Sequence, residues 1–217
     1  MAYADYPRAV SALELGPAHT RADHAAIARM LRTGASALDV GCGDGALLHL
    51  LARERGVRGR GLELNQASVN ACVAKGLVVA QGDADRDLKD YPSAGFDVVI
   101  LADAIQQVRQ PRTVLKQAAR IGERVIVSFS NFGHWRARAR LLTKGRMPVA
   151  LATPARWCDT DCLHPCSVRD FMELAAELHL TIERAMPISD GYVGAPFARN
   201  IWRANWFAEE AVFLLAG

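Results

Sequence analysis

Short apolar runs alternate with stretches of helical periodicity through the first 130 residues. Two of the runs, RVIVSF and FDVVIL, are almost unbroken, as expected for strands that are buried on both faces. Strands of this kind, separated by helices, are typical of a parallel sheet covered on both sides. The pattern predicts strands at 36–40, 58–64, 77–81, 96–101 and 124–129, and helices at 45–55, 68–75 and 111–120. We therefore expect an α/β fold with a doubly wound, mainly parallel sheet.

Two further helices are indicated by their capping residues. Thr20 followed by Asp23 predicts an N-cap with an acid three residues later, which would open a helix ending at residue 30. Ser167 followed by Asp170 predicts the same arrangement for a helix ending at residue 178.

The second half of the chain is less regular. Two closing strands are predicted at 181–186 and 210–215, and the segment 189–200 between them contains glycine and proline and is predicted to be a loop. Residues 131–166 contain a basic stretch and no clean strand. We expect them to form an insertion that lies over the carboxyl edge of the sheet.

Length and composition indicate one cofactor-binding domain over residues 1–217, with an N-terminal helical extension over about 1–34. The net charge of +3 is too small to indicate nucleic acid or a membrane surface. No apolar run approaches a membrane span, and the N-terminus lacks a signal-peptide pattern. With five cysteines, an odd number, we expect a cytoplasmic protein with reduced thiols. The composition leaves a homo-oligomer open.

The glycine-rich segment LDVGCGDG, residues 38–45, is the main candidate for a binding site. It follows the first predicted strand, and ligands of open α/β sheets bind beyond the carboxyl ends of the strands. Glycines there permit positive φ and close approach of a ligand, and the next helix offers free N–H groups. Gly41, Gly43 and Ala46 also satisfy the dinucleotide pattern G-x-G-x-x-A, so the glycines alone leave a nicotinamide cofactor open.

Three acids narrow the choice of ligand. Asp39 lies at the tip of the first strand, where a carboxylate suits an ammonium group and would repel a pyrophosphate. Glu63 ends the second strand and can accept hydrogen bonds from two ribose hydroxyls, which either ligand would require. Asp83 follows the third strand and is placed for the amino group of an adenine.

This pattern resembles that of class I methyltransferases, whose D-x-G-x-G-x-G turn matches Asp39, Gly41, Gly43 and Gly45. The resemblance implies a seven-stranded sheet and binding of S-adenosylmethionine or S-adenosylhomocysteine. The residues implied in cofactor binding are Asp39, Gly41, Cys42, Gly43, Gly45, Glu63, Leu64, Asp83 and Ala84. Cys42 is expected to be a small apolar filler beside the ligand.

A catalytic base is not obvious. Many small-molecule members of that superfamily have a histidine after the fourth strand, where this chain has Gln107, which cannot accept a proton at neutral pH. Asp103 is one candidate, but it is equally well explained as a helix-capping or solvated residue. His134 is the other, and the simpler interpretation is that it anchors the insertion together with Trp135.

Longer motifs narrow the resemblance to the MetW family of methionine biosynthesis proteins. They include VNACVAKGL, QGDAD-x-DL, NFGHW and GRMP, and extend roughly from Ala35 to Phe171. Ser130 and the pair Asp161-Cys162 depart from the family pattern. The resemblance implies support of homoserine O-acyltransferase (MetX), with no methyl acceptor established. A methyltransferase acting on a small metabolite and a purely structural partner with an idle pocket are the alternatives.

Three other features have two interpretations each. Cys158, Cys162, Cys166 and His164 have enough ligand atoms for a metal, but the family pattern needs only the last two, and we expect no metal. Trp202 and Trp206 suit an interface, but packing in the core or a loop is the expectation. The insertion has five cations in a run without an acid, which indicates either a solvated face or an acidic ligand or protein partner: Arg136, Arg138, Arg140, Lys144 and Arg146.

Overall fold

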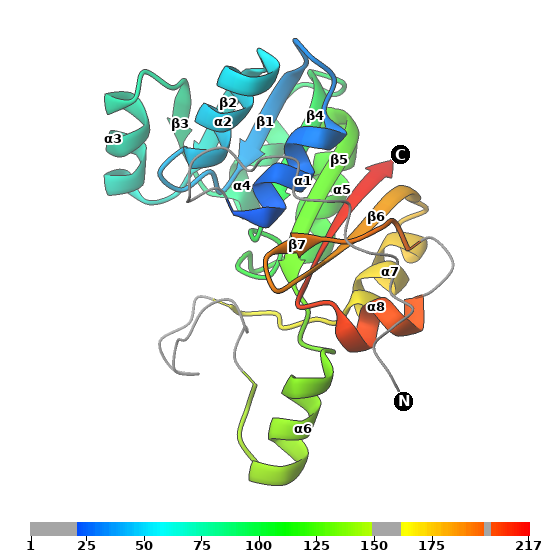
Figure 1. Ribbon diagram of the computed structural model, residues 1–217. Coiled ribbons are helices and arrows are strands. Elements are labelled where there is room, and N and C mark those ends of the chain that lie inside the picture. The colour runs from blue at the N-terminus through cyan, green and yellow to red at the C-terminus, as the bar shows by residue number, and fades with distance from the viewer. Residues whose placement is uncertain (1–20, 149–161, 198–200) are drawn as a thin grey trace.

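Eight strands form one sheet in the computed structural model, which describes residues 21–148, 162–197 and 201–217 (Figure 1). The strands are β1 (Ser36–Val40), β2 (Arg58–Glu63), β3 (Val79–Gln81), β4 (Phe96–Ala102), β5 (Gly122–Ser130), β6 (Thr181–Ser189), β7 (Tyr192–Val193) and β8 (Glu210–Ala216). The helices are α1 (Ala22–Met30), α2 (Ala46–Arg55), α3 (Gln66–Ala74), α4 (Ala84–Asp87), α5 (Pro111–Ile121), α6 (Trp135–Lys144), α7 (Val168–Glu177) and α8 (Ile201–Phe207). Within these ranges no helix has the length and apolar character needed to cross a bilayer.

The strand order is β3-β2-β1-β4-β5-β8-β6-β7. β1 to β5 pair in parallel, whereas β8 lies antiparallel between β5 and β6. The predicted α/β fold with a mainly parallel sheet is therefore confirmed, and the elements predicted in the first 130 residues end within two residues of the observed bounds. The order reverses between β1 and β4, which opens a crevice at their carboxyl ends.

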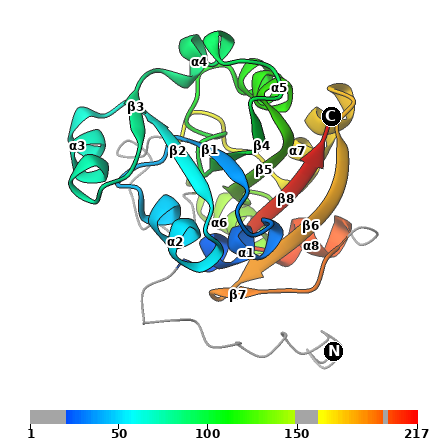
Figure 2. The same cartoon turned by 90° about the horizontal axis from the view of Figure 1, so that it is seen from above.

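Helices cover both faces of the sheet (Figure 2). Ile27 of α1 and Leu51 of α2 belong to the same buried cluster as Ile100 of β4. Val99 and Leu101, the neighbours of Ile100, belong to the opposite cluster with the apolar faces of α5 and α7. Successive side chains of a strand point to opposite faces of the sheet. Because both faces are buried, successive residues of these strands are apolar, which explains the unbroken apolar runs in the sequence.

An eighth strand corrects both the predicted loop at 189–200 and the seven-strand count. Asp190 and Gly191 both have positive φ, 50° and 76°, which forms a two-residue turn between β6 and β7. Asp-Gly is a strong sequence signal for such a turn, because its backbone twist matches that of the strands. The short helix α8 follows, and Trp202 on it is 64% exposed, so the expectation that Trp202 packs in the core or in a loop is wrong.

The two predicted helix caps have different outcomes. Ser167 and Asp170 form the complete capping box at the start of α7, as predicted. At α1 the N-cap is Arg21, without a side-chain hydrogen bond, whereas the predicted cap Thr20 lies outside the described residues. Asp23 does not close a capping box there, because its carboxylate accepts hydrogen bonds from Arg21 and Ser128 instead.

The insertion lies only partly over the carboxyl edge of the sheet, which corrects the prediction. After β5, helix α6 projects away from the sheet and ends in a left-handed cap at Gly145 (Figure 1). The returning segment does reach the edge, where the N–H groups of Leu163 and His164 donate to the Gln106 carbonyl at 2.8 and 3.0 Å. Most of the residues between lie outside the described ranges.

Four phenylalanines in the β5–β8–β6 half of the core generate a stability prediction. The ring of Phe213 lies 4.8 Å from Phe171, and 5.7 Å from both Phe129 and Phe197, and is fully buried. We expect Phe213→Ala to lower the free energy of unfolding by about 3–5 kcal/mol in urea titrations, because it removes these contacts and leaves a cavity. Tyr192→Ala, at a side chain 54% exposed, should cost under about 1 kcal/mol. Equal losses for both would contradict this core assignment.

Candidate functional site

A cavity of about 1070 Å³ lies at the carboxyl ends of β1, β2 and β4. Its walls come from the glycine turn, the turns after β2 and β3, the loop after β4, and the start of α1. Of the residues predicted to bind a cofactor, the cavity is lined by Asp39, Gly41, Cys42, Gly43, Glu63, Leu64, Asp83 and Ala84. Gly45 lies behind this wall, as the N-cap of α2.

The glycine turn is built around three left-handed residues. Gly41, Gly43 and Gly45 have φ angles of 74°, 54° and 77°. Residues other than glycine adopt such angles only at a cost in conformational energy. At Gly45 there is also no room, because a Cβ atom would lie 2.3 Å from Leu77 Cδ1. The need for glycine at this position therefore comes from packing against α3 and the residues that follow it.

Asp39 is buried without a partner for one of its oxygens. The residue is 1% exposed, and its Oδ1 has no hydrogen-bond partner in the part of the chain that the structure describes. Burial, reinforced by the negative charges of Glu63 and Asp23, raises the pKa of Asp39 to about 7. A cavity-lining carboxylate with an unused oxygen suits a positively charged donor such as an ammonium group.

Glu63 connects two turns of the cavity wall. Its Oε2 accepts the Gly43 N–H and its Oε1 accepts the Asn65 N–H, both at 2.8 Å. Each carboxylate oxygen can accept a second hydrogen bond. The two oxygens thus remain able to accept a pair of neighbouring hydroxyls.

Two acids of the turn after β3 organise the opposite wall. Asp83 Oδ1 accepts the Asp85 N–H at 2.9 Å and caps the short helix α4. The carboxylate of Asp85 accepts the N–H groups of Arg109 and Gln110, each at 2.8 Å. This pair of bonds holds the loop after β4 against α4, so carboxylates that accept backbone N–H groups fix both sides of the cavity.

Cys42 is a packing residue, as its predicted role as an apolar filler implies. Its sulfur occupies the space beside Gly61, where a Cβ atom would lie 2.5 Å away. Burial raises the pKa of the Cys42 thiol far above its usual range, so a reactive thiolate is disfavoured. A second cysteine, which the sequence interpretation missed, supports the turn: Cys72 of α3 donates from Sγ to the Gly43 carbonyl at 3.2 Å.

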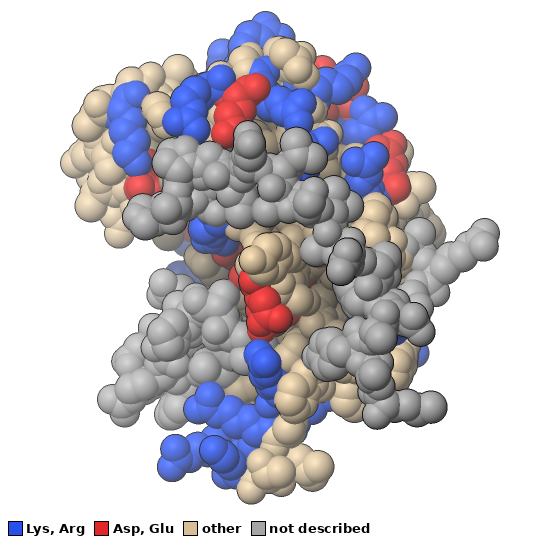
Figure 3. Space-filling view, viewed as in Figure 1, with Lys and Arg blue, Asp and Glu red and all other residues tan. Residues whose placement is uncertain are grey.

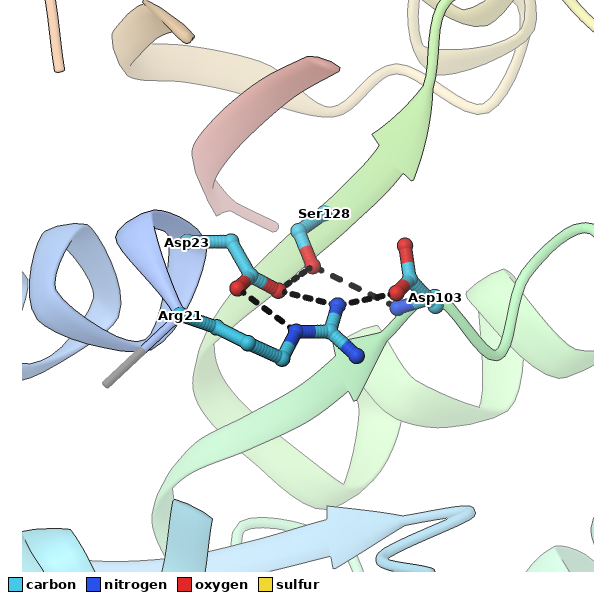
Figure 4. Close-up of polar contacts among 4 residues, drawn as sticks. All are labelled: Arg21, Asp23, Asp103 and Ser128. Carbon is cyan, nitrogen blue, oxygen red and sulfur yellow. Dashed lines mark hydrogen bonds and ion pairs between the residues drawn. The ribbon is translucent and has the colours of Figure 1, made fainter. Parts of the chain in front are cut away.

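Asp103 is held in an ion pair at the mouth of the cavity (Figure 4). The Arg21 guanidinium donates to Asp103, and also to both oxygens of Asp23 at 3.0 and 2.8 Å. Ser128 Oγ accepts the Asp103 N–H and donates to Asp23, each at 3.3 Å. Because Asp103 is engaged by the Arg21 guanidinium and by Ser128, this geometry favours a structural role for Asp103.

Among the wall residues that the sequence analysis missed, two come from a distant part of the chain. Arg21 and His24 line the cavity, both at the start of α1, although the sequence assigned that helix to an extension. Burial lowers the pKa of His24, so its imidazole is neutral at neutral pH. The signal available in the sequence was weak, because the two residues lie some 15 to 20 positions before the glycine motif.

His134 and Gln107 lie in different places. Gln107 lines the cavity, whereas His134 is not among the described residues of its wall. His134 is buried and caps α6, with Nδ1 accepting the Arg136 N–H at 3.1 Å, and burial lowers its pKa. This position agrees with an anchoring role for His134 in the insertion.

No metal-binding arrangement is present among the described residues, where no three His, Cys, Asp or Glu side chains are grouped to hold an ion. Of the cysteines considered for such a site, Cys158 lies outside the description. Burial raises the pKa of Cys166 to about 12, and its sulfur accepts a hydrogen bond from Gln106 Nε2 at 3.4 Å.

Comparisons with known proteins agree with this fold and show a family. The family profile described as methionine biosynthesis protein MetW matches residues 21–215. The bifunctional methionine biosynthesis protein MetXA/MetW of Rhodopirellula baltica is 28% identical over 170 residues, which is 74% of this chain. The matched region spans 27% of that relative's length, so the chain corresponds to about a quarter of it.

Solved structures share the fold at low sequence identity. A possible histamine N-methyltransferase of Thermotoga maritima superposes with a TM-score of 0.65 at 15% identity, covering 90% of this chain and 87% of that one. An S-adenosylmethionine dependent methyltransferase of Mesorhizobium loti gives a TM-score of 0.65 at 18% identity, covering 90% and 98%. The architecture is therefore that of the methyltransferase fold.

The buried Asp39 generates a pH-dependent stability prediction. In the folded protein it keeps its proton up to about pH 7, whereas in the unfolded chain it ionises above about pH 4. The folded state thus binds more protons in this window, and the stability contributed by Asp39 falls as the pH rises through it. We expect Asp39→Asn to raise the free energy of unfolding by about 1–3 kcal/mol at pH 8, measured in urea, and by much less at pH 5.

Asp97 provides the control with the opposite sign. Ser36 donates to it from N–H at 2.6 Å and from the hydroxyl at 2.7 Å, and these bonds hold the pKa of Asp97 below its usual range. Ionised Asp97 therefore stabilises the folded state at pH values above the usual pKa range of an aspartate, and Asp97→Asn should lower the free energy of unfolding at both pH 5 and pH 8. A gain from Asp39→Asn that is independent of pH would contradict the assigned burial cost.

Proposed function

The chain belongs to the MetW family of methionine biosynthesis proteins, and from this we propose that it binds S-adenosylmethionine or S-adenosylhomocysteine and acts as a ligand-responsive accessory partner of homoserine O-acyltransferase (MetX). The observation that carries the ligand proposal is Asp39 Oδ1, which is buried in the wall of the cavity at the glycine turn and has no hydrogen-bond partner among the residues that the structure describes. An amino-acid ammonium group supplies the donor that this oxygen lacks.

The cavity offers a partner for each part of such a ligand. Asp39 would hold the ammonium group and Arg21 the carboxylate of the methionine part, while Glu63 would accept the ribose hydroxyls. Asp83 would accept the adenine amino group, and Leu64, 65% exposed at the cavity, would lie against the adenine ring. A dinucleotide is disfavoured, because its pyrophosphate would be repelled by the Asp39 carboxylate.

The proposal of an acyltransferase partner is supported by the Rhodopirellula relative, whose name joins MetXA and MetW in one protein. Two functions encoded on one chain in one organism are often performed by associated chains in another. The ligand would regulate the acyltransferase only if it changes the affinity of this association.

Methyl transfer to a small metabolite is a second candidate function, and His24 is the observation in its favour. Its imidazole lines the cavity, and its lowered pKa leaves it able to accept a proton at neutral pH. Methyl transfer would leave S-adenosylhomocysteine as a product, so accumulation of that product with a candidate acceptor distinguishes the two functions.

The ligand proposal predicts how single substitutions change the affinities for two related ligands, measured by titration calorimetry. S-adenosylhomocysteine carries the amino-acid group, and 5′-methylthioadenosine lacks it. Asp39→Asn and Arg21→Gln should each lower the affinity for S-adenosylhomocysteine about tenfold or more, since each removes a charged hydrogen bond. The affinity for methylthioadenosine should stay within about twofold of that of the wild type. Glu63→Gln should weaken both ligands, because both contain the ribose.

The same titrations include a pH test. Ligand binding requires ionised Asp39, so the affinity of the wild-type protein for S-adenosylhomocysteine should rise about tenfold from pH 6 to pH 8, as a carboxyl with a pKa of about 7 loses its proton. Asp39→Asn should remove this rise. Binding of NAD in place of S-adenosylhomocysteine, or equal losses for both adenosine ligands with Asp39→Asn, would refute the assignment.

The partner proposal predicts binding to the homoserine O-acyltransferase of the same organism. We expect saturating S-adenosylhomocysteine to change the Kd of that complex at least fivefold, and the acyltransferase to change the affinity for the ligand by the same factor. The Asp39→Asn variant should bind the acyltransferase with the wild-type Kd when no ligand is present, and its Kd should not change when S-adenosylhomocysteine is added. If the acyltransferase binds with the same Kd with and without the ligand, the chain is a structural partner with an idle pocket. If it binds neither with nor without the ligand, the partnership is refuted.

A further inference from the structure

A second cavity, of about 980 Å³, lies between α7 and α8 and shares no described lining residue with the ligand cavity. Its wall includes charged side chains from α7, Arg169 and Glu173, and two aromatic ones from α8, Trp202 and Trp206. Arg138 of α6 completes one side. Nothing in the ligand site described above uses this cavity.

The aromatic residues of α8 form an exposed cluster. Trp202 is 64% exposed and Phe207 is 40% exposed. The Trp202 ring centre lies 6.0 Å from that of Trp206 and 6.1 Å from that of Phe207. Grouped, exposed aromatic residues are enriched where proteins bind other proteins.

Helix α6 has almost no packing of its own. All ten of its residues are described, and Ala137 alone is buried. Leu141 is 50% exposed and Leu142 is 87% exposed, near the far end of the helix. Isolated helices shorter than about 12–15 residues are marginal in water, so a projecting helix of this length gains from a surface that covers it.

The charge of α6 and its flanking residues has one sign. From residue 131 to residue 148 the sequence contains five Lys and Arg residues and no Asp or Glu. Figure 3 shows the cations gathered over the part of the molecule where α6 lies. Arg136 pairs with Glu209 at 3.2 Å, whereas Arg140 and Lys144 have no ion-pair partner among the described residues. Such a surface attracts an acidic one.

Arg138 joins the helix to the aromatic cluster. Its guanidinium carbon lies 4.6 Å from the centre of the Trp206 ring, and its Nε donates to the Gly133 carbonyl at 2.6 Å. Arg138 therefore links the start of α6 to the cavity and to the aromatic side chains of α8, and we name α6, this cavity and α8 together the basic–aromatic face.

We propose that the basic–aromatic face, made of α6, α8 and the cavity between α7 and α8, docks homoserine O-acyltransferase through an acidic surface with an apolar centre. This rests on the proposed function and adds the place of contact. The charge calls for an acidic partner, and the joined MetXA/MetW relative makes the acyltransferase the partner to which we commit. A nucleic acid would use the cations but leave Leu141 and Leu142 in water.

The position of this face also connects it to the ligand cavity. Leu163 lines the ligand cavity, and Cys166, three residues later, lines the second cavity. Gln106 holds both, because its carbonyl accepts the Leu163 N–H and its side chain donates to Cys166 Sγ. A ligand that moves this segment would thus alter the docking face, as a ligand-responsive partner requires.

The test measures the Kd of the full chain for the acyltransferase by biolayer interferometry at two salt concentrations. Three variants address the face: Arg140→Glu with Lys144→Glu, Leu142→Asp, and Trp202→Ala. Each should weaken binding at least tenfold, and the charge reversal should also reduce the dependence of association on salt. The control reverses the same charge elsewhere, with Arg29→Glu and Lys116→Glu on α1 and α5, and should stay within about twofold of wild type.

Melting temperature and S-adenosylhomocysteine affinity should be unchanged in the Leu142→Asp variant, since this side chain is 87% exposed, so weaker binding there reports the interface. If wild type binds the acyltransferase and all three variants bind equally well, the docking face is wrong while the partnership stands. If wild type does not bind, the partnership itself fails and the docking face with it. A wild-type dimer that Leu142→Asp dissociates, with acyltransferase binding unchanged, would instead assign the face to a second copy.

Discussion

The burial of the Asp39 carboxylate is the constraint around which the first half of the structure is arranged. Asp39 is the last residue but one of β1, a strand covered by helices on both faces, so its charge is removed from water before any ligand arrives. The nearest acids, Glu63 and Asp23, add repulsion and do not relieve it. A fold optimised for stability alone would place an uncharged residue here, and keeping the acid is understandable where a cation must be recognised.

The surrounding hydrogen bonds direct other polar groups away from Asp39. Glu63 is occupied by the backbone of two turns, Asp83 caps α4, and Asp85 fixes the loop after β4. Arg21 neutralises Asp23 and Asp103 across the mouth of the cavity and joins α1 to the ends of β4 and β5. Hydrogen bonds therefore hold the walls of the cavity, while Asp39 Oδ1 has no hydrogen-bond partner among the described residues, and this is the preorganisation that selective binding needs.

A second feature that calls for a partner is helix α6, which projects from the lower end of the molecule in Figure 1. Helix α6 has ten residues, of which one is buried, and a helix this short is only marginally stable without packing against other elements. Its cations and leucines, with the tryptophans of α8, have the composition of a surface used in association rather than of a solvated loop. Ligand recognition and partner contact thus occupy separate regions, which are connected through Gln106 and the segment it holds.

The sequence by itself determined the parallel sheet, the glycine turn and the acids at the strand ends, because these follow from apolar runs and local backbone requirements. Asp39, Glu63 and Asp83 could be assigned since each lies at or just past the carboxyl end of a predicted strand, and parallel strands bring these ends to one edge of the sheet. Only the tertiary structure brought Arg21 and His24 to the cavity, engaged Asp103, and exposed Trp202. Their positions depend on how α1 and α8 pack on distant strands, and no short-range pattern encodes such contacts.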